Sequence, residues 1–173
     1  VYGGGESYEG RKALYGTTDV REASLEKGSS ERIIGTWMQK HNCRDRVTLM
    51  TKLNTGATGD NIHRSFAGSR DRLQTEFVDI YLLHNPDTNV PVNETVQALS
   101  SLVESNQVGA IGCANHSATQ LQNALEASQS LGCRKYGIVQ TPYSLAWPDS
   151  EQALLPLCKQ EGIGVTSYSP LGA

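Results

Sequence analysis

The sequence predicts an α/β fold of the (β/α)8 barrel type, and three observations support this. Five short apolar runs rich in β-branched residues recur along the 173 residues. Their starts lie about 30 residues apart, the size of one strand-plus-helix unit. The stretches between the runs carry helix signals. Because strands that alternate with helices imply right-handed crossovers, we expect a parallel sheet.

The predicted strands are residues 47–50, 78–83, 108–112, 137–140 and 163–168. Two architectures accommodate such a repeat, an open doubly wound sheet and a closed (β/α)8 barrel. The open dinucleotide-binding fold carries GxGxxG directly after its first strand, and that motif is absent here. The regular period therefore favours the barrel.

Two helices are predicted to flank the first strand. Ser30 can cap a helix whose inward residues are Ile33, Ile34, Trp37 and Met38. Asp60 can cap the next, with Ile62, Phe66 and Leu73 inward, although Gly68 weakens it.

Three more helices follow the later strands. Asn93 is a candidate N-cap before an apolar stripe of Val96, Leu99, Leu102 and Val103. Ser117 and Gln120 form a capping box, with Gly132 as the stop and Leu121, Ala124, Leu125 and Ser128 on one face. Residues 149–161 are helical before Gly162, and Pro156 predicts a kink or a later start.

Composition excludes several classes of function. The chain has 15 Lys and Arg against 18 Asp and Glu, and no basic block, so a nucleic-acid partner is not indicated. No apolar run approaches the roughly 20 residues that cross a bilayer, so no membrane partner is expected. Four dispersed cysteines, Cys43, Cys113, Cys133 and Cys158, give neither zinc spacing nor a redox motif. We expect no metal site, buried thiols and a cytoplasmic location.

Polar residues lie at the carboxyl ends of all five predicted strands, at the same phase of the repeat. These are Lys52, His84, Asn115, Gln140 and Tyr168. Each alone has an ordinary structural explanation: a surface lysine, a hydrogen-bonded histidine, a turn asparagine, a core amide or an aromatic cover. Because a barrel brings the carboxyl ends of its strands to one mouth, their common phase predicts a site.

The residue types narrow the chemistry of that site. There is no carboxylate pair for glycoside hydrolysis at the strand ends and no Gly-x-Ser-x-Gly nucleophile elbow. Asn115 and Gln140 are amides suited to hold another amide, and Tyr168 offers a flat face for stacking. An aromatic ring bearing an amide, such as nicotinamide, would suit this set.

The chain resembles the aldo-keto reductase superfamily in segments that span nearly its whole length in the family's order. The matching segments are 1–5 (VYGGG), 30–35 (SERIIG), 46–52 (RVTLMTK), 72–84 (RLQTEFVDIYLLH), 111–115 (IGCAN), 138–143 (IVQTPY) and 164–172 (GVTSYSPLG). The resemblance implies a (β/α)8 barrel that reduces aldehydes or ketones to alcohols with NADPH, NADH not being excluded.

The resemblance also implies roles for individual residues. Tyr2, through its Tyr-Gly-x-Gly context, matches the family's general acid, Lys52 the lysine that lowers its pKa, and His84 the histidine that orients the carbonyl. Asn115 and Gln140 are then expected to bind the carboxamide and Tyr168 to stack on the ring. Ser169 and Leu171 are expected to approach the pyrophosphate.

The chain departs from the family pattern in three places. The family's catalytic Asp lies a few residues before the Tyr, which places it upstream of Val1. Tyr15-Gly16 offers a second, poorer match to the acid. Ala114 stands where the family usually has Ser, which removes one hydroxyl contact.

Two other functions remain open at this point. The first is a non-catalytic NADPH-binding regulatory subunit of the same fold, similar to channel β-subunits. The second is a barrel aldolase in which Lys52 forms a Schiff base. For the leading function the partner is a small carbonyl compound, and the sequence does not fix the oligomeric state.

Chain length bears on how much of the barrel is present. A (β/α)8 barrel typically has about 250 residues, whereas only five strands are found here. We expect residues 1–173 to be an internal part of a barrel domain, with residues 3–28 as a loop or insertion and the first strands and last βα unit missing. Five strands alone would form an open sheet with exposed apolar edges.

Overall fold

The structure is a computed structural model that describes residues 28–54 and 56–171. The chain divides into two compact units, Val1–Val47 with Gly68–Glu76, and Thr48–Ala67 with Phe77–Ala173. The described elements in chain order are α3 (Ser29–His41), η1 (Arg44–Arg46), β1 (Met50–Leu53), α4 (Gly59–Leu73), β2 (Val78–Leu83), α5 (Val92–Glu104), β3 (Val108–Ala114), α6 (Ala118–Leu131), β4 (Ile138–Pro142), η2 (Asp149–Glu151), α7 (Leu154–Glu161) and β5 (Gly164–Tyr168).

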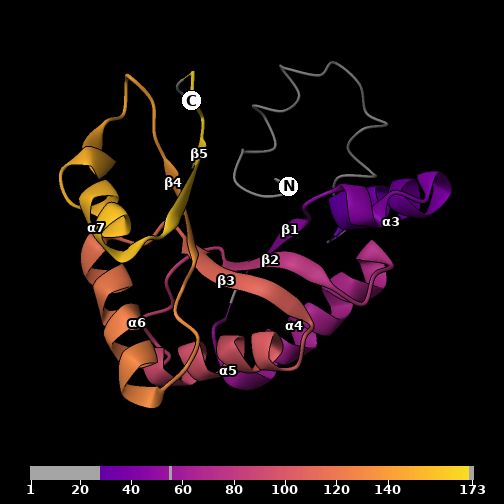
Figure 1. Ribbon diagram of the computed structural model, residues 1–173, viewed down its shortest axis with the longest axis horizontal. Helices are drawn as coiled ribbons and strands as arrows, with labels where there is room; N and C mark the ends of the chain where they lie inside the picture. Colours follow the sequence, from indigo (N-terminus) through magenta and orange to yellow (C-terminus); the bar gives the residue numbers. More distant parts are fainter. Residues whose placement is uncertain (1–27, 55, 172–173) are drawn as a thin grey trace. The chain divides into compact units, whose positions relative to one another are not determined.

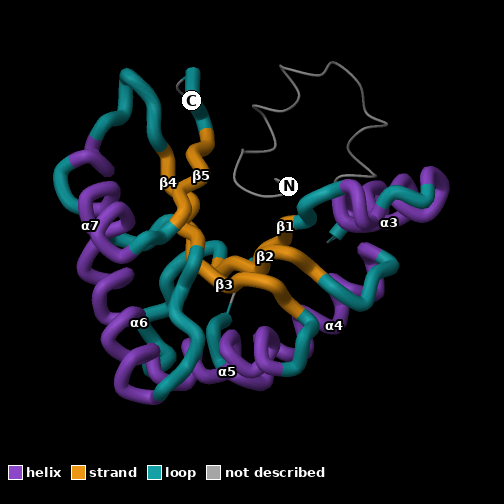
Figure 2. The backbone as a smooth tube through the Cα atoms, in the orientation of Figure 1, coloured by secondary structure: helices purple, strands orange, loops and turns teal. Residues whose placement is uncertain are grey.

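The second unit is built on one parallel sheet. Its five strands are hydrogen-bonded in the order β1-β2-β3-β4-β5, and every pair is parallel. Each strand lies beside the next one in the sequence, as expected for consecutive units of a barrel. In Figure 1, α5, α6 and α7 follow one side of this curved sheet, and Figure 2 shows the strands as one orange layer inside them. The prediction of an α/β fold with about five βα units of a (β/α)8 barrel is confirmed.

Four predicted strands agree with the structure to within two residues, but the first is displaced. Residues 47–50 were expected, whereas β1 is Met50–Leu53. The physical reason lies at Leu49, whose backbone N–H donates to the Asp79 carboxylate at 2.8 Å. That side chain, and not a strand carbonyl, satisfies the Leu49 N–H, while the Leu49 carbonyl oxygen already accepts from the Ile80 N–H at 3.0 Å. Regular pairing therefore begins with Met50 opposite Ile80.

The core of this unit lies between the sheet and its helices. Alternate strand residues such as Tyr81, Ile111 and Val139 are at most 1% exposed. The α5 residues Val96, Leu99 and Leu102 are buried to the same degree, as the predicted stripe requires, whereas Val103, its fourth member, is only half-buried. Tyr81 also meets Phe66 of α4 edge-on, with ring centroids 5.0 Å apart.

The helix termini show where capping signals can be read from sequence. The Ser117–Gln120 capping box and the left-handed Gly132 of α6 are both present, as predicted. Helix α7 starts at Leu154, after the short η2, so Pro156 lies in the first turn, where a missing N–H is harmless. The prediction of Asn93 as N-cap was wrong, because α5 begins at Val92 after Pro91 and Asn93 lies inside its first turn.

In the first unit, α3 buries a face that matches the predicted one only at Met38, which is 2% exposed. Ile33 and Trp37 are 65% and 49% exposed, contrary to expectation, and the N-cap is Gly28 rather than Ser30. The buried residues are Glu31, Gly35 and Met38, which share one helix face. A Cβ on Gly35 would lie 2.5 Å from the Arg72 carbonyl oxygen, and Glu31 accepts a hydrogen bond of 2.6 Å from Arg72. Close backbone approach and an ion pair therefore select this face over the more apolar one.

Candidate functional site

The candidate site lies where the five parallel strands end. In register, Lys52 is opposite Leu82, Ala114 is opposite Gln140, and Pro142 is opposite Tyr168. Residues in register have side chains on the same face of a parallel sheet. Lys52, Gln140 and Tyr168 therefore share the face opposite to the helix-packed core, and His84 and Asn115 follow directly after β2 and β3.

Lys52 and Gln140 are joined directly, although they are 88 residues apart. The Lys52 Nζ donates to Gln140 Oε1 at 2.6 Å. The Gln140 Nε2 has longer contacts, 3.3 Å to Thr166 Oγ1 and 4.0 Å to Met50 Sδ. A hydrogen bond to a charged donor is the stronger kind, so Lys52 orients the Gln140 amide.

A second set of hydrogen bonds connects the ends of β2, β3 and β5. The Tyr168 hydroxyl donates to Asn115 Oδ1 at 2.5 Å. The Asn115 Nδ2 donates to the His84 carbonyl oxygen at 2.8 Å and to Asn85 Oδ1 at 3.1 Å. Asn115 has a left-handed backbone, φ 60°, which turns its side chain back across the strand ends. Both polar atoms of the Asn115 amide are thus engaged by the protein.

Burial shapes the protonation of the site. Burial lowers the pKa of Lys52. Burial, and then the positive charge of Lys52, lower the pKa of His84 below its usual value of 6.5, so His84 is neutral at pH 7. Burial raises the pKa of Tyr168, which keeps its hydroxyl protonated as a hydrogen-bond donor. The site therefore presents a lysine beside a neutral imidazole.

The structure does not bring every predicted residue into this group. Lys52, His84, Asn115, Gln140 and Tyr168 are gathered at the strand ends. Ser169 follows β5 in a left-handed conformation, φ 54°, and Leu171 is 98% exposed with no described contact to the group. Tyr2, Tyr15 and nearly all of segment 3–28 lie outside the described residues.

Three residues that the sequence reasoning did not select also belong to the group. They are Asn54, which contacts the His84 ring, Asn85, which contacts Asn115, and Thr166, which contacts Gln140. A signal for Asn54 was available, since it occupies after β1 the place that His84 occupies after β2. The displaced prediction of the first strand hid it.

Other features of the described residues bear on what the chain binds. Cys43, Cys113 and Cys158 are buried free thiols, and Cys133 is half-buried. In the part of the chain that the structure describes, no group of three His, Cys, Asp or Glu side chains is placed to hold a metal ion. Nor does any helix among these residues combine the length and apolarity needed to span a membrane.

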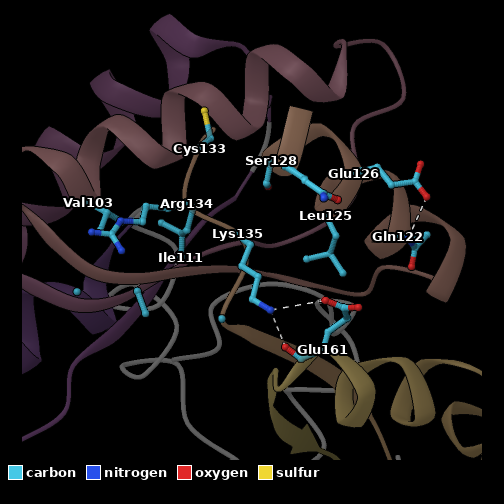
Figure 3. A pocket seen from close by; sticks show the side chains of 14 residues that line it. Val103, Ile111, Gln122, Leu125, Glu126, Ser128, Cys133, Arg134, Lys135 and Glu161 are labelled. Carbon is cyan, nitrogen blue, oxygen red and sulfur yellow. Dashed lines mark hydrogen bonds and ion pairs between the residues drawn. The ribbon is translucent and has the colours of Figure 1, made fainter. Parts of the chain in front are cut away.

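A cavity of about 670 Å³ lies at the opposite ends of the strands. Gly109 near the start of β3 and Gly137 just before β4 line it, together with residues of α6. Figure 3 shows Lys135 reaching across it to Glu161, where its Nζ bonds the carbonyl oxygen at 2.6 Å and the carboxylate at 3.6 Å. None of the strand-end residues lines this cavity, so it is separate from the candidate site.

Parallel strands that alternate with helices, and that carry polar residues at their carboxyl ends, define this chain as part of a (β/α) barrel. A sequence model described as "Aldo/keto reductase family" matches residues 8–173. The chain belongs to the aldo/keto reductase family.

Relatives and one solved structure agree with that assignment. The chain is 31% identical to norsolorinic acid reductase B of Dothistroma septosporum, over 84% of this chain and 41% of the relative. It is also 31% identical to the aldo-keto reductase YhdN of Bacillus subtilis, over 83% and 44%. An aldo/keto reductase of Klebsiella pneumoniae, solved in complex with NADP and acetate, is 33% identical with a TM-score of 0.72, over 83% of this chain and 49% of that one. The chain thus spans less than half the length of these proteins.

Proposed function

We propose that the full-length protein containing this chain reduces aldehydes or ketones to alcohols with NADPH. One observation carries the proposal: hydrogen bonds link Lys52 to Gln140, and Tyr168 to Asn115 and the His84 backbone, so that polar residues from five consecutive strands gather at one end of the sheet. The NADP complex of the Klebsiella pneumoniae structure supports the choice of cofactor.

The described residues fit a nicotinamide group. Gln140 has an amide Nε2 with only long contacts, 3.3 and 4.0 Å, so a carboxamide oxygen could replace them as its acceptor while Lys52 keeps its bond to Oε1. Tyr168 is half-buried at the end of β5, where its ring offers a stacking face. Asn115 can bind the carboxamide only if it gives up one of its present hydrogen bonds, to Tyr168, the His84 carbonyl oxygen or Asn85. Gln140 and Tyr168 therefore carry most of the proposed recognition.

When bound, NADPH supplies a hydride to the carbonyl carbon, which leaves NADP⁺ and a carbonyl oxygen that needs one proton. Tyr2 is proposed to donate that proton, so that the O–H bond of the tyrosine breaks as the O–H bond of the alcohol forms. A free tyrosine has a pKa of about 10 and is a weak acid near neutrality. The positive charge of Lys52 would stabilise the phenolate that remains, and so lower the pKa of the acid.

His84 is proposed to hold the carbonyl oxygen. Its backbone is fixed by two hydrogen bonds, from its N–H to the Leu53 carbonyl oxygen at 3.0 Å and from Asn115 Nδ2 to its own carbonyl oxygen at 2.8 Å. A donor whose backbone is already fixed stabilises a developing alkoxide with less reorganisation, and His84 can act as that donor when its ring proton is on Nε2. The imidazole would therefore favour the charge that appears on oxygen as the hydride arrives.

The test uses the full-length protein and a panel of aliphatic and aromatic aldehydes and ketones. Lys52→Met and His84→Gln should each lower carbonyl-dependent NADPH oxidation by roughly 10²- to 10⁴-fold, the usual contribution of acid–base groups. Lys159→Met and His63→Gln make the same changes at exposed positions on α7 and α4 and should retain activity. Circular dichroism should show that all four variants are folded. Unchanged turnover in both site variants would overturn the proposal.

Further outcomes separate this function from the alternatives. Tyr2→Phe should reduce turnover far more than Tyr15→Phe, if Tyr2 is the acid. Tight NADPH binding with no turnover across the carbonyl panel would instead support a non-catalytic binding subunit. Trapping of a carbonyl compound on Lys52 by borohydride would support a Schiff-base enzyme.

A further inference from the structure

Asn54 stands at a place in the sheet that is equivalent to that of His84. The last paired residues of β1 and β2 are Leu53 and Leu83, so Asn54 and His84 are the next pair along the two chains. The ladder continues to this point, because the His84 N–H donates to the Leu53 carbonyl oxygen at 3.0 Å. The position of Asn54 beside the imidazole is therefore set by sheet pairing, and not by a chance approach of a loop.

The side chains of the two residues are in contact. Asn54 Oδ1 lies 3.1 Å from His84 Nδ1. Within residues 28–54 and 56–171, the Nε2 of the same ring makes no hydrogen bond. Asn54 thus holds one ring nitrogen and leaves the other facing away from it.

A neutral imidazole has one proton for two nitrogens, so the partner of one nitrogen decides what the other can do. Lys52 of β1 is the charged side chain that acts on His84, and Tyr168 of β5 reaches the same strand end through Asn115. Neither contacts Nδ1. Among the described residues, Asn54 is therefore the group that hydrogen-bonds to Nδ1.

An amide suits this position because it has both a hydrogen-bond acceptor, Oδ1, and a donor, Nδ2. With Oδ1 toward Nδ1, as in the structure, the ring proton is on Nδ1 and Nε2 is an acceptor. With the amide turned over, Nδ2 donates to Nδ1 and the proton is on Nε2, where it can be donated to a substrate oxygen. A carboxylate in the same place would accept only, and would hold the proton on Nδ1.

We propose that Asn54 is a positioning residue for His84, which holds the ring and, by the orientation of its own amide, selects which ring nitrogen carries the proton. The part of this role that concerns substrate rests on the proposed carbonyl reduction. The tautomer itself does not, and it can be measured without turnover.

The first experiment measures the ring directly, in full-length protein labelled with ¹⁵N-histidine. Asn54→Leu removes both the acceptor and the donor of the amide. The ¹⁵N shifts of the neutral His84 ring should then change toward those of a different tautomer population. Asn54→Asp places a negative charge beside Nδ1 and should raise the pKa of His84 by about one unit relative to the wild type. Asn123→Asp, the same substitution at an exposed position on α6, should do neither.

The second experiment measures the pH profile of carbonyl reduction. In Asn54→Asp, Nε2 carries a proton only while the ring is an imidazolium, so kcat should fall about tenfold as pH rises through the raised pKa of His84. Wild type and Asn123→Asp should lack that loss, because turning over the Asn54 amide lets their neutral ring carry its proton on Nε2 and donate it. Thermal melting should show that the variants are folded, as expected for an exposed residue such as Asn54.

Each outcome decides the proposal. Unchanged ring shifts in Asn54→Leu, or an unshifted His84 titration in Asn54→Asp, would overturn it. So would a changed tautomer with a wild-type pH profile, since the tautomer would then not matter to substrate. If the wild type reduced no carbonyl compound, the proposed function would fail, while the ring shifts would still confirm or overturn the structural role of Asn54.

Discussion

The Tyr168 hydroxyl donates a hydrogen bond of 2.5 Å to Asn115 Oδ1, which joins the end of β5 to the end of β3. Asn115 passes the connection on to β2 through the His84 carbonyl oxygen, at 2.8 Å. The same tyrosine thus has two possible uses: its hydroxyl ties strand ends together, and its ring offers a surface for stacking. Substitutions can separate the two, because phenylalanine keeps the ring and loses the hydroxyl.

We predict that Tyr168→Phe and Tyr168→Ala affect stability and NADPH affinity differently. Tyr168→Phe should lower the free energy of unfolding by about 1 kcal/mol, the net value of one hydrogen bond, and should leave the NADPH Kd within about threefold of wild type. Tyr168→Ala also removes the stacking face, so its Kd should rise roughly tenfold. Urea unfolding and fluorescence titration with NADPH measure the two quantities.

Tyr143→Phe is the matched control for this prediction. Its hydroxyl also donates a hydrogen bond of 2.5 Å, to Glu151, outside the strand-end group. Its NADPH affinity should equal that of wild type. Equal weakening of cofactor binding in Tyr168→Phe and Tyr168→Ala would show that the hydroxyl matters and the ring does not.

The sequence predicted the fold where the signal is local and periodic. Strand β2 was found with its exact bounds, and the capping box of α6 was found residue by residue, because each depends on neighbours in the chain. The start of β1 was missed because it depends on the Asp79 side chain, 30 residues away. The buried face of α3 was missed for a similar reason. Gly35 is buried against the backbone of Arg72, and Glu31 is buried by its bond to the Arg72 side chain, which lies 41 residues away.

The candidate site was predictable as a set of positions but not as a set of contacts. The phase of the repeat is enough to bring Lys52, His84 and Gln140 to one end of the sheet. It does not predict that Lys52 bonds to Gln140, or that the Asn115 amide bonds to Tyr168 and to the His84 carbonyl oxygen. Those pairings depend on strand register and on the left-handed turn at Asn115, which are properties of the folded chain.

We predict that Gly112→Ala strongly destabilises the sheet. A Cβ at Gly112 in β3 would lie 1.9 Å from the Ile138 carbonyl oxygen and 2.9 Å from Leu82 Cδ2. Because the first neighbour is backbone, relief requires β3 and β4 to separate, at a cost of about 3 kcal/mol or more. The loss should appear as a lower urea midpoint in the full-length protein.

Gly137→Ala is the control for this substitution. Its Cβ would meet only the Ile111 carbonyl oxygen, at an ordinary 3.9 Å. Its urea midpoint should stay close to that of wild type. A Gly112→Ala protein as stable as Gly137→Ala would mean that the β3–β4 pairing is looser than the register indicates.

We predict that Ser117→Ala weakens α6 at its N-terminus. The Ser117 hydroxyl accepts from the Gln120 N–H at 3.2 Å, and the Gln120 side chain accepts from the Ser117 N–H at 2.9 Å. Loss of the cap should cost about 1 kcal/mol of unfolding free energy. Thr119→Ala, an exposed change in the same turn, should not destabilise, since alanine favours helix. Urea unfolding of both variants measures the difference, and equal stabilities would contradict a role for the cap.

We predict that stability falls as pH falls below about 6.5, in part because of His116. This residue is only 9% exposed, and its Nδ1 lies 2.8 Å from the Ala114 carbonyl oxygen, so the neutral ring donates from Nδ1. Burial lowers the pKa of His116, against a smaller opposite effect of that hydrogen bond. An unfolded histidine has a pKa of about 6.5, so between that pH and the lower folded pKa the unfolded state binds more protons. Stability is therefore complete above about pH 6.5 and is lost as the pH falls through this window.

His116→Asn tests the assignment of this pH dependence. The Asn Nδ2 occupies the place of the His Nδ1 and can keep the bond to the Ala114 carbonyl oxygen, but it does not titrate. The variant should lose some stability at pH 7.5, because it fills less of the buried space, and should then lose less than wild type between pH 6.5 and pH 5. Urea unfolding at several pH values gives both slopes. A slope as steep as that of wild type would assign the acid sensitivity to other groups, of which His84, with a pKa lowered in the same direction, is the next to examine.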